Sequence, residues 1–198
     1  MAMRPGTEQK LLDAAEELFF TRGIVATPID AVLARAGVSS ATLYRGYPSK
    51  ESLVAAVLER RHDDWLVVWD AAVAAAPDDR GRLLAVFDAL DAYRTTERGS
   101  RWCAFLGTAA EYAEAPEGVH EVLGLETGTL RRRLTAFAGP LVPSGAAELA
   151  DQLLLVVSGY LAMRLRNPAL GTDTARTIAA ALLSAAAGRP VRPAARAR

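Results

Sequence analysis

Residues 27–50 read TPIDAVLARAGVSSATLYRGYPSK, and this stretch carries the start and stop signals of consecutive short helices. Thr27, followed by Pro28 and Asp30, predicts an N-cap, a proline at the first helical position and a capping box. Gly37 can take the left-handed conformation that ends a helix. Between these signals, apolar residues recur at the spacing of one helical face, at Ile29, Val32, Leu33 and Ala36.

A second short helix is expected directly after the glycine. Ser39 is placed to cap it, and Val38 and Leu43 occupy the two positions of a hydrophobic staple. That staple fixes the direction in which the second helix leaves the turn. Two short helices joined by a tight turn that contains glycine form the helix-turn-helix of DNA-binding proteins.

The outward side chains of the second helix are small, hydroxylic, aromatic or basic, and none of them is acidic: Ser40, Ala41, Thr42, Tyr44 and Arg45. Small residues allow close approach to base edges, and Thr and Tyr hydroxyls can donate to phosphate oxygens. Ser49 is expected to cap a third helix, which places Lys50 and that helix's free N–H groups where a phosphate could bind.

The run AGVSSATLYRGYPSKESL, residues 36–53, resembles the signature of the TetR (tetracycline-repressor-like) family of transcriptional regulators. The family has a Gly-Val-Ser turn, then a Thr-Leu-Tyr recognition helix, an aromatic residue and Ser-Lys-Glu. The resemblance extends over most of residues 7–60. One departure is Gly46, which stands where the family commonly has His or Asn and which removes a possible phosphate contact.

The resemblance implies residue roles. It gives Thr42, Tyr44 and Lys50 as phosphate contacts, and it gives Ser40, Ala41 and Arg45 as residues that face the groove. Tyr47 matches an aromatic residue that packs in the core of the small domain. With the two expected caps, the predicted DNA-binding set is Thr27, Ser39, Ser40, Ala41, Thr42, Tyr44, Arg45 and Lys50.

Composition is that of a globular protein. Of 198 residues, 51% are hydrophobic and 23% charged, which is enough apolar material for a core and argues against disorder. The net charge is zero, and residues 1–62 carry eight basic and seven acidic side chains, so DNA binding would need a local basic face.

Cysteine usage and hydropathy predict a cytoplasmic protein. Cys103 is the sole cysteine, so no disulfide can form within the chain, and a buried inert thiol is expected rather than a redox sensor. No uninterrupted apolar run approaches the ~20 residues of a membrane span, and no signal peptide is recognisable near the N-terminus.

The whole chain is expected to be all-α, with about nine helices. An N-terminal three-helix DNA-binding domain is predicted over residues 1–48, with its first helix starting near Thr7, followed by a helical effector-binding and dimerisation domain over 49–188 and a disordered tail over 189–198. A long fourth helix from Lys50 to about Pro77 is expected to connect the two domains. The last two long helices are expected near 145–166 and 173–187, the latter capped by Thr172.

A homodimer is the expected assembly. Leu153 to Val157 are apolar on every side of their helix, and one small protomer leaves little to cover them. The resemblance implies the same, because TetR-like proteins pair their last two long helices with those of a partner. Two recognition helices would then lie about one turn of DNA apart, ~34 Å.

The second domain is rich in aromatic residues, and an apolar cavity with a few polar groups would suit a small-molecule effector. The predicted effector-binding set is Trp65, Trp69, Phe87, Trp102, Phe105, Tyr112, His120 and Tyr160, although each aromatic alone is more simply a core residue. Glu111 and Arg164 are further candidates for orienting a ligand's polar end, whereas His62 is expected to be solvated.

The preferred hypothesis is a ligand-responsive, sequence-specific regulator of transcription, most simply a repressor that a small apolar or aromatic effector releases from a double-stranded DNA operator. The alternative is a TetR-like fold that acts through protein partners. An enzyme is not expected, because the sequence shows no phosphate loop, nucleophile elbow or metal-ligand spacing and calls for no cofactor or metal.

Overall fold

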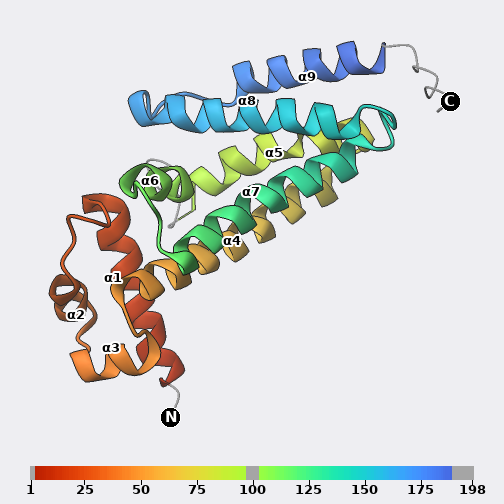
Figure 1. Ribbon diagram of the computed structural model, residues 1–198. Coiled ribbons are helices and arrows are strands. Elements are labelled where there is room, and N and C mark those ends of the chain that lie inside the picture. Colours follow the sequence, from red (N-terminus) through yellow and green to blue (C-terminus); the bar gives the residue numbers. More distant parts are fainter. Residues whose placement is uncertain (1–2, 97–102, 189–198) are drawn as a thin grey trace, which may run out of the picture. The chain divides into compact units, whose positions relative to one another are not determined.

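The computed structural model describes residues 3–96 and 103–188, and these residues form helices and no strand. The helices are α1 (Pro5–Arg22), α2 (Ile29–Ala36), α3 (Ser40–Gly46), α4 (Lys50–Ala75), α5 (Asp79–Arg94), α6 (Ala104–Glu111), α7 (Glu117–Ala138), α8 (Ala146–Arg166) and α9 (Asp173–Ala187) (Figure 1). The all-α prediction is confirmed. The bounds predicted for the helices that became α4, α8 and α9 agree with the structure to within a few residues.

The chain divides into two compact units, and two of the three points of division fall inside the long helices α4 and α7. The first unit contains Met1–Leu66 and Trp102–Thr127, and the second contains Val67–Arg101 and Gly128–Arg198. The sequence-based boundary near residue 48 stays a prediction. The expected tail over 189–198 lies outside the described residues.

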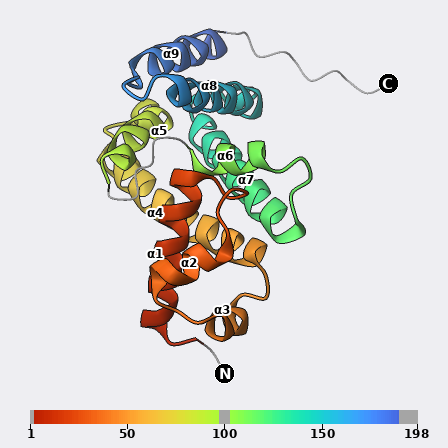
Figure 2. The same ribbon diagram turned by 90° about the vertical axis from the view of Figure 1, so that its left-hand side faces the viewer.

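In the first unit, α1 packs against α2, and α3 lies near the N-terminal end of α1 (Figure 2). Helix α1 begins at Pro5, two residues before the expected start, because proline suits the first helical position, where no N–H is needed. Its apolar stripe buries Leu11, Ala15, Leu18 and Phe19, and Phe20 and Ile24 join them. Leu53, Val54, Val57 and Leu58 of α4 complete this core.

An ion-pair cluster joins α1 to α4 beside that core. Arg61 is 4% exposed and donates to Glu16 at 2.6 Å, while Arg60 reaches Glu16 at 2.5 Å and Asp13 at 2.8 Å. The guanidinium of Arg61 also lies over the ring of Phe20, at 5.2 Å. Acidic side chains on one face of α1 are therefore paired with basic side chains of α4, which packs against that face.

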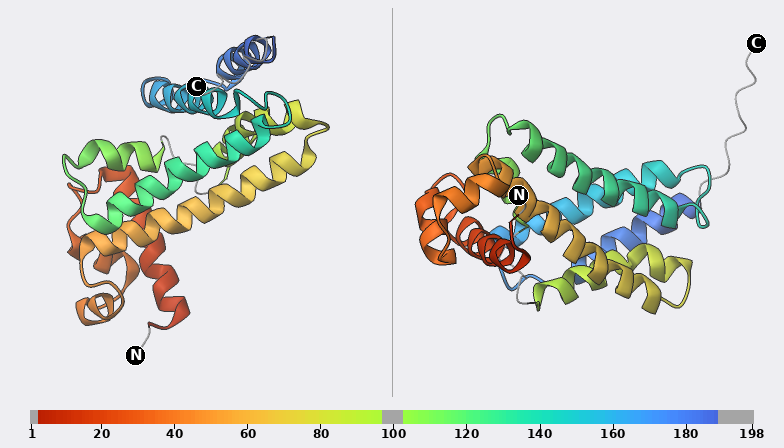
Figure 3. Two further views of the ribbon diagram at one scale, coloured as in Figure 1. Left: turned by 45° about the vertical axis from the view of Figure 1, so that its right-hand side comes forward. Right: turned by 90° about the horizontal axis from the view of Figure 1, so that it is seen from below.

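In the second unit, α4 and α7 run side by side (Figure 3). Arg133 of α7 pairs with Asp70 and lies over the fully buried Trp69, 4.4 Å from its ring centroid, and Phe137 meets the same ring edge-on. Helices α8 and α9 also pack together, and α9 contacts α5.

The start of α9 differs from the sequence-based expectation. Thr172 precedes the helix, but its side chain accepts no capping hydrogen bond. The buried Thr172 hydroxyl instead donates to Asp91 of α5. A partner that is distant in sequence has replaced the expected local cap.

Candidate nucleic-acid interface

The turn between α2 and α3 has the geometry that its glycine predicted. Gly37 has φ 65° and ψ 37°, the left-handed conformation, and the N–H of Val38 donates to the carbonyl of Leu33 at 3.1 Å. Val38 is half-buried and Leu43 is fully buried. The corner is thus fixed by backbone conformation and by burial of the first core residue of α3.

Ser39 caps α3 as expected. Its Oγ accepts from the Thr42 N–H at 3.3 Å and lies 2.9 Å from the Thr42 hydroxyl. Both hydroxyls are near the N-terminal turn of the helix, which carries partial positive charge. One hydroxyl proton is shared between the two oxygens, and the other is free to donate to an anion at that end.

The outward side of α3 is open to solvent. Ser40, Ala41 and Arg45 are exposed, and Tyr44 is 51% exposed although it is a large aromatic side chain. No acidic residue occurs in α3. An exposed helix face of small, aromatic and basic residues is suited to a negatively charged groove.

The start of α4 adds a second set of donors. The Ser52 N–H donates to Ser49 Oγ, and the Ser49 N–H donates to Ser52 Oγ, both at 3.1 Å, which is a reciprocal capping box built from two serines. Lys50 is half-buried, with its ammonium 5.9 Å from the ring centroid of Phe19. Its charge therefore lies at the start of α4, near a ring of the core.

Thr27 corrects the sequence-based expectation. It is 1% exposed, and Pro28 rather than Thr27 is the N-cap of α2, with no side-chain cap. The Thr27 hydroxyl donates to the Gly23 carbonyl at 2.6 Å, and the Leu18 carbonyl lies 3.3 Å away. Thr27 thus satisfies carbonyls at the end of α1, and its side chain has no surface to offer a ligand.

Tyr47 links the end of α3 to α1. Its half-buried ring packs against the core of the first unit, as the resemblance implied, and its hydroxyl donates to Glu8 Oε1 at 2.9 Å. Burial, followed by the hydrogen bond to Glu8, raises the pKa of Tyr47 well above its ordinary value. The hydroxyl therefore stays protonated and keeps this bond at every physiological pH.

The predicted effector-binding residues are distributed over both units. Trp65, Phe105, Tyr112 and His120 belong to the first unit, and Trp69, Phe87 and Tyr160 belong to the second. Trp102 lies outside the described residues. Trp69 and Phe87 are fully buried, which is the simpler core role that each aromatic could have, while His120 is exposed. The ligand role of this set stays a prediction.

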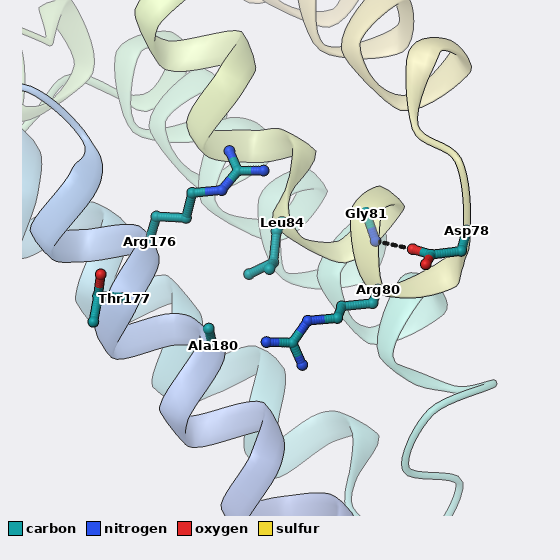
Figure 4. A pocket seen from close by; sticks show the side chains of 7 residues that line it. All are labelled: Asp78, Arg80, Gly81, Leu84, Arg176, Thr177 and Ala180. Carbon is teal, nitrogen blue, oxygen red and sulfur yellow. Dashed lines mark hydrogen bonds between the residues drawn. The ribbon is translucent and has the colours of Figure 1, made fainter.

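Two cavities are recorded in the described part of the chain, and neither is lined by those residues. The larger, about 440 Å³, lies in the second unit between the first turns of α5 and the middle of α9, where Arg80 and Arg176 extend over Leu84 (Figure 4). Asp78 caps α5 at its rim, by accepting from the Gly81 N–H at 2.6 Å. The other, about 380 Å³, lies between α1 and α2 and includes Lys10 and Arg35.

Several polar residues lie elsewhere than expected or have partners within the chain. His62 was expected in solvent but is 4% exposed, with its ring edge-on to Phe105 at 6.3 Å. Glu111 accepts from the Val25 N–H at 2.9 Å, and Arg164 is buried above the ring of Tyr160. The half-buried Cys103 has a pKa raised to about 11, mainly by desolvation, as an inert thiol would.

Comparison with known proteins agrees with the local geometry. Residues 11–57, which contain all of α2 and α3, match the family described as bacterial regulatory proteins, tetR family. The transcriptional regulator SCO4454 of Streptomyces coelicolor, a TetR-family protein, superposes with a TM-score of 0.83 at 25% identity, over 93% of this chain and 98% of that one. Residues 11–57 carry the TetR-family N-terminal domain, and the chain has the fold of a TetR-family regulator.

Two curated relatives match less than half of this chain. The transcriptional repressor KstR2 of Rhodococcus jostii is 36% identical over 93 residues, 45% of this chain and 46% of that protein. The transcriptional activator FasR of Mycolicibacterium smegmatis is 40% identical over 80 residues, 40% of this chain and 36% of that protein. The matched stretch spans less than half the length of either relative. Both are named as regulators of transcription, not as enzymes.

Proposed function

We propose that this TetR-family protein is a sequence-specific, double-stranded-DNA-binding regulator of transcription that inserts α3 into the major groove. The observation that carries the proposal is the solvent-facing side of α3, where Ala41, Tyr44 and Arg45 are exposed, no acid is present and the helix is held by a capped turn. Arg45 is suited to a bidentate contact with guanine, and Ala41 to the methyl group of thymine.

Contacts with DNA phosphates would lie beside the base contacts made by Arg45 and Ala41. Tyr44 and Thr42 offer hydroxyls, and Lys50 and the free N–H groups at the start of α4 offer charge and dipole. Because these contacts neutralise phosphates, binding should weaken steeply as salt rises. Thr27 is left out of this surface because it is buried.

We propose a homodimer formed through α8 and α9. The exposed side of α8 carries Leu155, Gly159 and Met163 at the spacing of one helix face, with Leu155 74% exposed and Met163 50% exposed. On α9 the exposed side holds Ile178 among small residues. Apolar faces with small residues allow close helix–helix approach, and a second copy would cover both.

The same helix bears on localisation. In the described ranges, α8 alone is long and apolar enough to cross a membrane by length and composition, with a mean hydropathy of 1.3, whereas the sequence showed no uninterrupted span. Leu149, Leu153 and Val157 are buried inside the second unit, which favours a bundle helix with one side reserved for a partner. We propose a cytoplasmic protein accordingly.

Response to a small apolar or aromatic effector is part of the proposal. Effector binding to the aromatic-rich helices from α4 onward would favour a conformer with lower DNA affinity, so the ligand and the operator would weaken each other's binding by linkage. Repression relieved by the effector is the simplest form. One relative is named a repressor and the other an activator.

The test begins by selecting duplexes from a random pool with the purified protein. Arg45→Ala should change the selected sequence, whereas Tyr44→Phe should weaken binding to all duplexes by a similar factor. Arg80→Ala, which removes an exposed arginine from the second unit, is the matched control and should change neither. Recovery of no preferred sequence, or of the same sequence and affinity with Arg45→Ala, would overturn the proposal.

A further inference from the structure

The end of the recognition helix has no side chain at the point where the N-terminal segment meets it. A Cβ placed on Gly46 would lie 2.6 Å from Met3 Cε and 3.9 Å from Met3 Cβ. A contact below 3 Å requires one of the two atoms to move, so any larger residue at 46 would shift the terminal methyl group of the flexible Met3 side chain. Gly46 has no positive φ, so its value here is space rather than backbone freedom.

Two further contacts hold the same segment in place. Met3 packs against the hydrophobic core of the first unit. One turn into α1, Glu8 accepts the hydroxyl proton of Tyr47, the residue that follows Gly46. The start of α1 is therefore tied to the end of α3 at Gly46 and at Tyr47, and Figure 1 shows the two helix ends close together.

Arg4 is the residue that this arrangement positions. It follows Met3 in the chain, so the Cα atoms of the two residues are about 3.8 Å apart. Arg4 is exposed and in extended conformation at the N-cap of α1. By contrast, three other basic residues of the first unit are held in ion pairs with α1 acids, namely Arg35, Arg60 and Arg61. In the described ranges no ion pair to Arg4 is recorded.

We propose that Arg4 binds a DNA phosphate beside the groove that α3 enters, and that Met3 and Gly46 are positioning residues for it. The proposal depends on the DNA-binding function proposed above. It gives the weakly charged N-terminal region a further cation on the DNA side. The proposal also accounts for the glycine at position 46. A His or Asn there would make its own phosphate contact, whereas the space left by Gly46 is occupied by Met3, which positions Arg4.

The experiment uses the full chain and a duplex selected by the wild-type protein. Each neutralised phosphate contributes about 0.9 to the slope of log affinity against log salt. Arg4→Ala should reduce that slope by about 0.9, so that the affinity lost between about 50 and 200 mM salt becomes about 3.5-fold smaller. The matched control is Arg22→Ala, an exposed arginine at the opposite end of α1, which should leave the slope unchanged.

Gly46→Ala tests whether the space left by Gly46 positions Met3. In the wild-type background it should reduce the salt slope, by less than Arg4→Ala does, because the new methyl group shifts the end of the Met3 side chain. In a Met3→Ala background, which already lacks the seated side chain, Gly46→Ala should have no further effect on the slope.

The outcomes separate the two proposals. If the wild-type protein selects no duplex, the DNA-binding function itself fails. If it selects one and Arg4→Ala leaves the salt slope at the wild-type value, the assignment of Arg4 is overturned while DNA binding stands. A Gly46→Ala slope that equals wild type overturns the positioning role of Met3.

Discussion

The hydroxyl of Tyr47 donates a 2.9 Å hydrogen bond to Glu8, which joins the residue after the recognition helix to the first turn of α1. Tyr47→Phe should lower the free energy of unfolding by about 1.5–3 kcal/mol, the range for hydrogen bonds to charged groups, and towards its lower end because both residues are only half-buried. Tyr44→Phe is the control, since Tyr44 is 51% exposed, and it should leave stability unchanged. Urea unfolding of both variants checks this; equal midpoints would contradict it.

The ion-pair cluster of α1 and α4 gives a second contrast. Glu16→Gln leaves the buried guanidinium of Arg61 without its carboxylate, and unfolding free energy should fall by roughly 3–5 kcal/mol. Glu17→Gln breaks only the pair with Arg35, whose side chains are 58% and 49% exposed, and should cost less than about 1 kcal/mol. Thermal unfolding of the two variants measures the difference, and similar melting temperatures would show that the cluster is not structural.

Two glycines should respond to alanine with opposite signs. Gly37 is left-handed, with no atom within 4 Å of the point that an alanine methyl group would occupy, so Gly37→Ala should cost about 1–2 kcal/mol from backbone strain alone. Gly124, inside α7, also has open space but a helical backbone, and Gly124→Ala should stabilise by about 1 kcal/mol. Chemical denaturation checks both signs, and stabilisation by Gly37→Ala would contradict the turn geometry.

Self-association should depend on the outer side of α8. We expect the wild-type protein to have twice the 21.1 kDa mass of one chain by light scattering, and Leu155→Glu to approach the monomer value. Leu125→Glu, at a 46% exposed leucine of α7, should keep the dimer mass. A dimer that survives Leu155→Glu would place the interface on another surface.

Cys103 should react slowly. With a pKa of about 11, roughly 0.1% of the thiol is ionised at pH 8, against about a quarter for an ordinary cysteine, so alkylation should be about two hundred times slower than in the urea-unfolded chain. Because the folded pKa lies above the unfolded value, the protonated thiol contributes stability below about pH 8.5, and this is lost as pH rises towards 11. Alkylation rates that titrate near pH 8.5 in the folded protein would refute this.

The local features around α3 were predictable because neighbours in sequence make them. Gly37 and the Ser39 cap involve residues within five positions, and the sequence specifies both partners. Thr27 was predicted wrongly for the opposite reason: its hydroxyl bonds to carbonyls of α1 that tertiary packing brings near. The capping role predicted for Thr172 was wrong for the same reason, because its hydroxyl donates to Asp91 of α5.

The apolar periodicity of α4 could have predicted that His62 is buried. It lies four residues after the buried Leu58 and three before Trp65, which is on the same stripe of α4, and it is buried there against Phe105. No such signal existed for the effector set. Aromatic content predicts a core, and whether a core leaves room for a ligand depends on packing between distant helices, so Trp69 and Phe87 appear simply as filled core positions. The contact of Met3 with Gly46 likewise joins residues 43 positions apart, which no periodicity reveals.

The seat of Met3 on Gly46 also has a practical consequence for handling the protein. Any affinity tag or reporter fused ahead of Met3 would emerge next to the recognition helix, where its bulk or its histidines could obstruct or mimic operator contact. Binding assays are therefore better performed on protein whose purification handle is attached at the other terminus, or is removed by protease before the measurement.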